Sequence, residues 1–310
     1  MNYFKNYVYF FALIFSLSFF IQFFPQTSFA SSFYYPSKVQ NSFKKLQQLN
    51  AAKLEQNFNI LSLLPSNELS LLKEQFTKHL ASIFLVSKHA VCTKNNPSCL
   101  LNSQKKYKQA RKYIFGLLHL KGKSKKEYYI NDIYCSRSFT NKDFPKNKNL
   151  GPNKIPLHTV LNTEHIWPQS RFSSHYPTVT QLTDLHILYP SDSKTNSQRG
   201  NNLFGEVSKV RSISCGTSKI GFSKNSSEVN FEPPNNYKGN VARAMFYFSL
   251  RYKLPISLKK QKMFKRWAML DPVDEFEINR NEAIFKINKT RNPFIDQPES
   301  ILYISDSWGK

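Results

Sequence analysis

The chain has 310 residues, of which 40% are hydrophobic and 15% aromatic, so it can fill a core and is not a disordered chain. Lysine and arginine together number 44 against 20 acidic residues, which gives a net charge of +24. Such a surplus indicates anionic partners. Nucleic acid is the natural polyanion; an anionic cell envelope, or solubility alone, are the alternatives, and charge does not decide between them.

The first thirty residues have the three parts of a secretory signal peptide. Lys5 precedes an apolar run over 8–24, and the small residues Ser28 and Ala30 flank Phe29. This pattern predicts cleavage after residue 30 and a secreted or periplasmic protein that is not inserted in a membrane. The alternative is a membrane anchor, because the apolar run approaches the ~20 residues that span a bilayer.

An amphipathic helix is predicted in residues 64–84. Apolar side chains recur there at helical spacing behind Ser66, which can cap the helix. They are Leu69, Leu72, Phe76, Leu80 and Ile83. We therefore expect residues 31–104 to form an N-terminal helical region that packs on the rest of the chain.

A second helix is predicted in residues 105–120, with four side chains on its apolar face. They are Tyr107, Ala110, Ile114 and Leu117. Gly116 interrupts this face, and marks either a close approach of another segment or a weak point.

Two strands are predicted next. Residues 127–135 and 157–165 carry β-branched and aromatic residues at the density of strands, and a loop rich in Lys, Asn and Pro separates them.

Two more amphipathic helices are predicted near the end of the chain. In residues 239–252 the spacing turns Arg243 and Arg251 away from the core. The side chains spaced for burial are Val241, Met245, Phe248 and Tyr252. In residues 274–287 the expected anchors are Phe276, Ile284 and Ile287. Together these elements predict an α+β fold, a single mature domain that is mostly helical around a small antiparallel sheet.

Four cysteines in an exported chain suggest disulfides. Three pairings are possible, and we favour Cys92 with Cys99 and Cys135 with Cys215. One bridge with two buried thiols is the alternative. The cysteines and histidines do not have the spacing of a zinc finger.

The segment "NTEHIWPQSRF" places an acid, Glu164, beside a base, His165. Phosphodiester hydrolysis requires activation of water and neutralisation of charge, for which histidine and Mg²⁺ suffice. A neutral imidazole is available near pH 7, and a carboxylate is a hard oxygen ligand of Mg²⁺. The alternative is packing, with His165 in a hydrogen-bond network and Glu164 paired with a surface lysine, because a two-residue match has a high false-positive risk.

Neighbouring residues on a regular strand point to opposite faces of the sheet. Glu164 and His165 can therefore line one pocket only if the strand ends or bulges at this pair. Pro168, three residues farther on, favours an ending.

A second oxygen ligand is expected in "SDSKTNSQRG", which predicts a short helix because Ser191 or Asp192 can cap its start and Gly200 can end it. Asn196 lies in the middle of this helix, where asparagine is unfavourable without a reason. Arg199 lies on the same face and can hold a phosphate, while Asp192 either orients the amide or pairs with Arg199.

Several ordered blocks extend this pattern: "YCSR", "TEHIWPQSRF", "TDLHILYPSDSKTNSQRGNNLFGEV", "GNVARAMFYFSLRY" and "RNEAIFKINKTRNPFIDQP". Over roughly residues 105 to 300 they resemble the endonuclease I family of exported, non-specific nucleases. The metal site of that family belongs to the ββα-metal (His-Me finger) class.

The resemblance implies that residues 105–310 form a nuclease domain with a ββα-metal motif. It implies that His165 is the general base and that Glu164 and Asn196 bind Mg²⁺, replaceable by Mn²⁺ or Ca²⁺. Arg171 and Arg199 are both candidates for the arginine that stabilises the phosphate.

The activity implied is sequence-non-specific hydrolysis of DNA, with RNA as a further substrate, by a monomer that contacts the phosphate backbone and leaves 5′-phosphate ends. His186 matches a family position that is either catalytic or structural, and Asp184 is expected to cap or orient. The alternative function is a catalytically inactive, exported basic protein that binds nucleic acid or the envelope.

Overall fold

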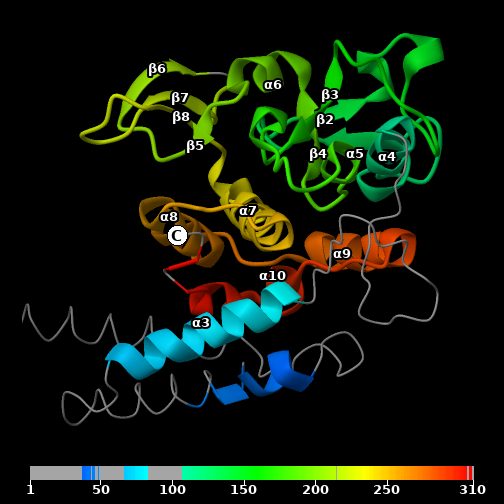
Figure 1. Ribbon diagram of the computed structural model, residues 1–310. Coiled ribbons are helices and arrows are strands. Elements are labelled where there is room, and N and C mark those ends of the chain that lie inside the picture. Colours follow the sequence, from blue (N-terminus) through cyan, green and yellow to red (C-terminus); the bar gives the residue numbers. More distant parts are fainter. Residues whose placement is uncertain are drawn as a thin grey trace, which may run out of the picture.

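The computed structural model places helix α7, Lys238–Tyr252, between a layer of strands and a group of helices (Figure 1). The structure describes residues 37–42, 44, 45, 48, 66–82, 107–213, 215–305, 307 and 308. The predicted signal segment and the predicted Cys92–Cys99 bridge lie outside these residues. No helix within the described ranges is long and apolar enough to span a membrane.

The described chain begins and ends with helices, and the strands lie between them in the sequence, with two short α-helices among them. The helices are a stretch at 37–42, α3 (Ser66–Ser82), α4 (Tyr107–Tyr113), the π-helix η1 (Ile114–Leu118), α5 (Thr178–Leu182), α6 (Ser193–Arg199), α7, α8 (Leu258–Leu270), α9 (Glu275–Asn288) and α10 (Pro293–Asp296). The 3₁₀ turns are η2 (Asn141–Asp143), η3 (Lys146–Lys148), η4 (Gln169–Arg171), η5 (Asn235–Tyr237) and η6 (Pro298–Tyr303).

The strands form small sheets above α7 (Figure 1). They are β1 (Tyr129–Asn131), β2 (Ser138–Thr140), β3 (Leu161–His165), β4 (Leu188–Asp192), β5 (Leu203–Phe204), β6 (Lys209–Ile213), β7 (Lys219–Phe222) and β8 (Val229–Glu232). The pairs β1–β2 and β3–β4 are antiparallel, and the third sheet has the order β5-β8-β7-β6, in which β5 runs parallel to β8. The α+β class is confirmed, but the chain is about half helical and not mostly helical.

The partner of β3 is β4, a strand that the sequence analysis did not predict. Pro190 lies in the middle of β4, opposite Thr163 of β3. Proline is tolerated there because β4 pairs with β3 alone, so that one side of the strand needs no donor from Pro190. The carbonyl of Pro190 still accepts a hydrogen bond from Ile133 N at 3.1 Å.

Helix α7 corrects the expectation that Arg243 and Arg251 face solvent, because every residue of this helix is buried. Arg243 Nε donates to Glu277 Oε1 at 3.0 Å, and Arg251 Nε lies 3.3 Å from Asp184 Oδ2. A helix enclosed on all sides has no solvent face, so its charged residues must be paired.

Helix α4 continues into the π-helix η1, and this changes which side chains are buried. Leu117 was expected in the core but is 54% exposed, whereas Leu118 is buried. A π turn has more residues than an α turn, so the apolar face shifts by one position. Gly116 is a point of close approach, because a Cβ there would lie 2.5 Å from Asn153 N.

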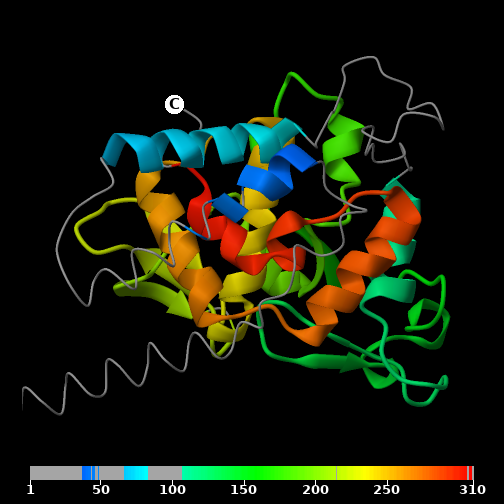
Figure 2. The same ribbon diagram turned by 90° about the horizontal axis from the view of Figure 1, so that it is seen from below.

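Helix α3 crosses α7 and the C-terminal segment on the side away from the strands (Figure 2). Leu72, Phe76 and Leu80 are buried, as their spacing predicts. Thr77 Oγ1 accepts a hydrogen bond from Ser305 N at 2.8 Å, which joins this helix to the end of the chain.

Arg280 of α9 is buried and ties this helix to the β3–β4 pair. Its Nη2 donates to the carbonyls of Leu185 and Leu188, and its Nε donates to His119 Nε2 at 3.1 Å. The guanidinium also lies 4.3 Å from the ring centroid of Tyr189 in β4. The Arg280 side chain therefore holds both the segment before β4, at Leu185, and the first residue of the strand, Leu188.

Candidate active site

Strand β3 ends at the Glu164–His165 pair, whose partners in β4 are Tyr189 and Leu188. Because the strand stops here, the two adjacent side chains reach the same pocket, of about 390 Å³. Asn196 and Arg199 from α6 line it too. The prediction that the strand ends at this pair is confirmed, and four of the five expected site residues lie together.

His165 is 5% exposed, and its hydrogen bonds define its tautomer. Nε2 lies 3.0 Å from Leu182 O, and a carbonyl can only accept, so Nε2 carries the proton. Nδ1 then holds the lone pair, and Gln169 Nε2 donates to it at 3.2 Å. Burial lowers the pKa of His165 to about 4, so the imidazole is neutral at pH 7.

Glu164 is 1% exposed, and one of its oxygens is fully engaged. Oε1 accepts from Tyr134 OH at 2.9 Å and pairs with Arg199 Nη1 at 2.9 Å. Burial raises the pKa of Glu164, and the Arg199 guanidinium opposes this shift. Oε2 has no hydrogen-bond partner within the described residues, so it is available to a ligand in the pocket.

Asn196 is held in the same way, by one atom of its amide. Nδ2 donates to Thr163 O of β3 at 3.1 Å, which leaves Oδ1 without a partner in the described part of the chain. Helix α6 starts where predicted, because Asp192 Oδ1 accepts from Thr195 N at 2.9 Å, and Gly200 ends it with φ 53°. Asp192 therefore caps the helix, and neither orients the amide nor pairs with Arg199.

Arg199 is buried, and its guanidinium contacts the residues that form the wall of the pocket. Besides Glu164, its guanidinium donates to the carbonyls of His165 at 3.1 Å and Ile166 at 2.8 Å. Its plane also lies over Phe204, 4.7 Å from the ring centroid. These contacts fix the end of β3 and leave little of the guanidinium for a phosphate.

Arg171 is the one expected site residue that does not line the pocket. It is exposed at the end of η4 and lines an adjoining hollow instead. The structure shows no ion pair of Arg171 within the described residues. Its main-chain carbonyl accepts from Trp167 Nε1 at 2.8 Å, which holds this turn against the core.

His186 and Asp184 belong to a buried network away from the pocket. His186 Nε2 lies 3.2 Å from Thr290 O, and burial lowers its pKa well below the usual range. Asp184 accepts hydrogen bonds from Tyr247 OH and Tyr252 OH of α7, in addition to its ion pair with Arg251 of the same helix. Burial raises the pKa of Asp184. Asp184 therefore joins the segment before β4 to α7, and His186 joins it to the segment after α9.

The sequence did not indicate Tyr107 and Gln169, which line the pocket, or Tyr134, which donates a hydrogen bond to Glu164. Gln169 follows Pro168 directly, so its place in the motif was a usable signal. The ring of Tyr107 lies 5.8 Å from that of His165, a contact that spacing along the chain could not indicate.

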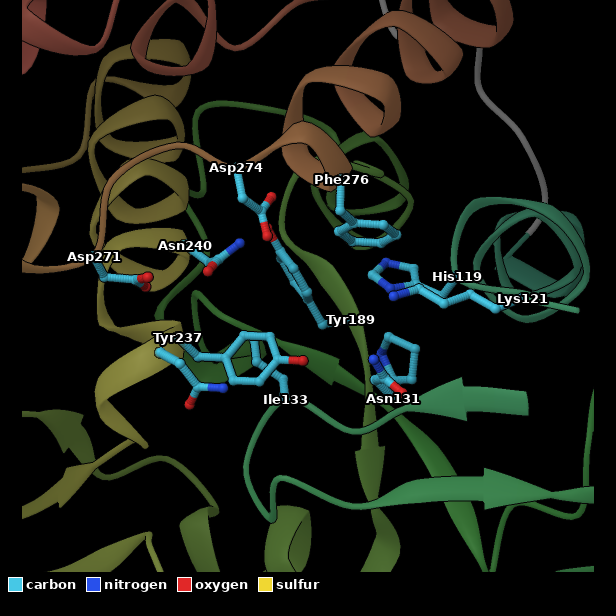
Figure 3. A pocket seen from close by; sticks show the side chains of 12 residues that line it. His119, Lys121, Asn131, Ile133, Tyr189, Tyr237, Asn240, Asp271, Asp274 and Phe276 are labelled. Carbon is cyan, nitrogen blue, oxygen red and sulfur yellow. The ribbon is translucent and has the colours of Figure 1, made fainter. Parts of the chain in front are cut away.

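A second cavity, of about 300 Å³, lies between β4 and the starts of α7 and α9 (Figure 3). Its carboxylates have structural tasks, since Asp271 Oδ2 accepts from Gly239 N and Asp274 Oδ1 accepts from Glu277 N. His119 is held by Arg280 as described above. None of the expected site residues lines this cavity, so the candidate site is the pocket at the end of β3.

The pocket at the end of β3 thus brings together a buried neutral histidine, a carboxylate and an amide oxygen on this α+β fold. The family model described as Endonuclease I matches residues 92–299. The chain belongs to the endonuclease I family.

Proteins similar in sequence to this chain support the membership, because they are named as nucleases. The extracellular ribonuclease of Bacillus subtilis (strain 168) is 35% identical over 156 residues, which cover 44% of this chain and 51% of that protein. Endonuclease-1 of Buchnera aphidicola subsp. Acyrthosiphon pisum is 32% identical over 114 residues, 36% of this chain and 44% of the relative. An extracellular deoxyribonuclease of Aeromonas hydrophila is 29% identical over 116 residues, which cover 37% of this chain and 49% of that protein. The matched segments thus span about half the length of these relatives.

Proposed function

We propose that this protein is an exported, metal-dependent endonuclease of low sequence specificity that hydrolyses phosphodiester bonds of DNA, and also of RNA. The observation that carries the proposal is the pocket at the end of β3. Glu164 Oε2 and Asn196 Oδ1 have no hydrogen-bond partner there within the described residues, and His165 Nδ1 accepts only from Gln169, which lines the same pocket. Relatives named for ribonuclease and for deoxyribonuclease activity support both substrates.

The donor set at the pocket fits Mg²⁺. Glu164 and Asn196 offer one hard oxygen each, and Mg²⁺ in proteins prefers oxygen ligands and keeps several waters. Within the described residues there is no cluster of three or more His, Cys, Asp or Glu that could hold a metal. A site with two protein ligands and several waters agrees with that. When bound, the ion would neutralise charge on the phosphate, and β3, β4 and α6 would form the ββα-metal motif.

His165 acts as the general base through Nδ1. The carbonyl of Leu182 keeps the proton on Nε2 and fixes the ring, so the lone pair on Nδ1 faces the pocket. This nitrogen takes a proton from the attacking water. Gln169, which donates to Nδ1, must release it when the water binds.

The two arginines divide the remaining tasks. Arg199 positions Glu164 and the end of β3, because its guanidinium is engaged there. Arg171 is exposed at the mouth of the adjoining hollow, and we propose that its guanidinium contacts a phosphate of the substrate.

The setting is extracytoplasmic. Cys135 and Cys215 form a disulfide, and disulfides persist in oxidising compartments. Relatives named extracellular or periplasmic support the same location. We further propose that residues 31–104 are a region that packs on the nuclease domain, 105–310, and that the protein acts as a monomer.

The test is plasmid cleavage by residues 31–310 in Mg²⁺ and in EDTA, beside His165→Ala. Because a positioned base contributes about 10²–10⁴-fold, we expect the variant to lose at least about a hundredfold in rate while still binding DNA. The control is His158→Ala, since His158 is exposed and outside the pocket. Binding without cleavage by the wild type in any divalent metal would favour the inactive, nucleic-acid-binding alternative.

A further inference from the structure

An apolar hollow of about 190 Å³ adjoins the catalytic pocket. Pro168 and Arg199 line both spaces, so the two lie next to each other. The other walls of the hollow are mainly apolar: Trp167, Leu203, Phe204, Met245, Pro255, Ile256 and Phe264. Arg171 and Lys260 are the charged residues at its edge besides Arg199.

An open apolar hollow beside a polar pocket is unfavourable in water unless a ligand covers it. The walls are fixed by the core, since Trp167 and Phe264 are buried and the Trp167 ring stacks on Phe248 at 5.3 Å. A nucleic-acid base has flat apolar faces, and every base shares this property. A hollow of this size and composition therefore suits one base without selecting its identity.

The surface next to the hollow carries more cations than anions, with Glu206 and Glu228 as its acidic residues. Lys260 also lines the next depression, of about 420 Å³, beside α8. Lys259, Lys262 and Arg266 line that depression too, and their spacing places them on one face of α8. Arg266 pairs with Glu206 at 3.0 Å, whereas Lys259 and Lys262 are exposed without an ion pair in the described residues. This face suits the phosphates of a strand that leaves the hollow.

We propose that the hollow binds the unstacked base of a nucleotide next to the cleaved bond, and that the strand then follows α8 over Lys259 and Lys262. This inference rests on the proposed nuclease function and specifies its substrate. A base within a duplex is stacked and paired, so it cannot enter the hollow unless the duplex is opened. The substrate that fits is a single strand, or a strand locally freed from its partner.

The test uses the wild-type protein with Mg²⁺ and an end-labelled single strand of DNA that carries one abasic position. Loss of the base removes its contact with the hollow but keeps the backbone. We expect cleavage of one bond, at a fixed offset from the abasic position, to fall about tenfold, in the range measured for single base–aromatic contacts. The other bonds of the ladder serve as internal controls, and the suppressed band should move with the abasic position.

A variant that fills the hollow gives an independent check. Leu203 is half-buried at the wall, so Leu203→Trp occupies the space with little loss of core packing. We expect Leu203→Trp to cleave single strands about tenfold more slowly and to lose the effect of the abasic position. Leu117→Trp is the matched control, because Leu117 is 54% exposed and lines neither space; it should behave as the wild type.

The outcomes separate the two proposals. Cleavage of the unmodified strand with a uniform ladder around the abasic position would overturn the base-binding role of the hollow and leave the nuclease function standing. Failure to cleave the unmodified strand in Mg²⁺, Mn²⁺ or Ca²⁺ would overturn the nuclease function. The proposal that the hollow binds a substrate base would then fail as well, because it rests on that function.

Discussion

His165 and Glu164 are both buried, and burial shifts their pKa values in opposite directions. The pKa of His165 is lowered to about 4 and that of Glu164 is raised. Both shifts favour the neutral side chain, because desolvation penalises charge. In the proposed mechanism the neutral imidazole is the active form of the base, whereas the carboxyl must lose its proton to bind a cation.

The first prediction concerns the acidic limb of activity. Falling pH protonates His165 only near its lowered pKa, and protonates Glu164 at a higher pH than an exposed glutamate. We expect kcat/KM to stay level through the ordinary histidine value of about 6.5 and to fall only at lower pH, as one or both groups gain a proton. Initial rates between pH 3.5 and 8 at fixed ionic strength test this. A midpoint at the ordinary histidine value of about 6.5 would contradict the burial of the base.

The second prediction concerns the buried pair of Arg199 and Glu164. Arg199→Met leaves the carboxylate buried without its cation, which costs about 3–5 kcal/mol in comparable pairs. The control is Arg266→Met, whose pair with Glu206 is about half exposed and should contribute less than about 1 kcal/mol. Urea denaturation of both variants measures the difference. Equal losses would mean that the Arg199 pair does not hold the pocket.

At the level of single residues, the sequence indicated the pair at the end of β3 and also Asn196, because each lies in a short motif whose residue types suggest its chemistry. It misjudged Arg243 and Arg251, since helical spacing indicates which side chains share a face but not whether another helix covers that face. Arg199 was placed correctly on its helix, yet its contacts with Glu164 and with main-chain carbonyls depend on the fold of β3.

Helix α6 is short, and its position depends on its first turn. Asp192 caps it through Thr195 N, and the helix in turn carries Asn196 into the pocket. The caps were predictable, because Asp before a helix and Gly after it act through local hydrogen bonds and backbone angles.

The third prediction tests this cap. Asp192→Ala removes the acceptor of Thr195 N and should lower the free energy of unfolding by about 1 kcal/mol. It should also lower cleavage at limiting Mg²⁺, because Asn196 would be less well placed. Asp274→Ala removes the equivalent cap of α9, where Asp274 accepts from Glu277 N at 2.8 Å, and should cost similar stability without the metal effect. An unchanged Mg²⁺ dependence in Asp192→Ala would contradict a metal role for α6.

The π turn and β4 show where local signals fail. The shift from Leu117 to Leu118 arises where the backbone at Gly116 meets Asn153, a segment distant in sequence. Strand β4 contains a proline and was not predicted, because its tolerance of Pro190 depends on having only one neighbouring strand.

For the molecule as a whole, the Cys135–Cys215 disulfide confirms the predicted pairing and closes a loop with a sequence separation of 80. It joins the segment after β1 to the turn between β6 and β7. Thr195 of α6 lies beside it, with Oγ1 3.2 Å from Cys135 Sγ. The bridge therefore braces the helix that carries Asn196.

The fourth prediction is that Cys135→Ser with Cys215→Ser lowers the free energy of unfolding by about 4.5 kcal/mol, the value that chain entropy gives for a loop of this length. Cleavage should fall at temperatures where the wild type is still folded. Thermal melting with and without a thiol reductant gives the same comparison for the native chain. A melting temperature unmoved by reduction would show that the bridge does not stabilise the fold.

The sheets as a set were the least predictable part of the fold. The sequence indicated two strands, but the pairing of β3 with β4 and the four-stranded sheet depend on contacts between segments that no local period records. The amphipathic helices were easier, because a stripe of apolar residues at period 3.6 is visible in a short window.

The contacts of Arg280 have a consequence for the order in which the protein is made. The residues of the pocket at the end of β3 leave the ribosome well before α9, yet the carbonyls of Leu185 and Leu188, at the start of β4, accept hydrogen bonds from Arg280 of that helix. A nascent chain that stops short of α9 would thus contain every residue of the pocket without the guanidinium that holds the start of β4. We expect such a chain to be inert toward nucleic acid, so that synthesis itself delays the activity until the last long helix has docked.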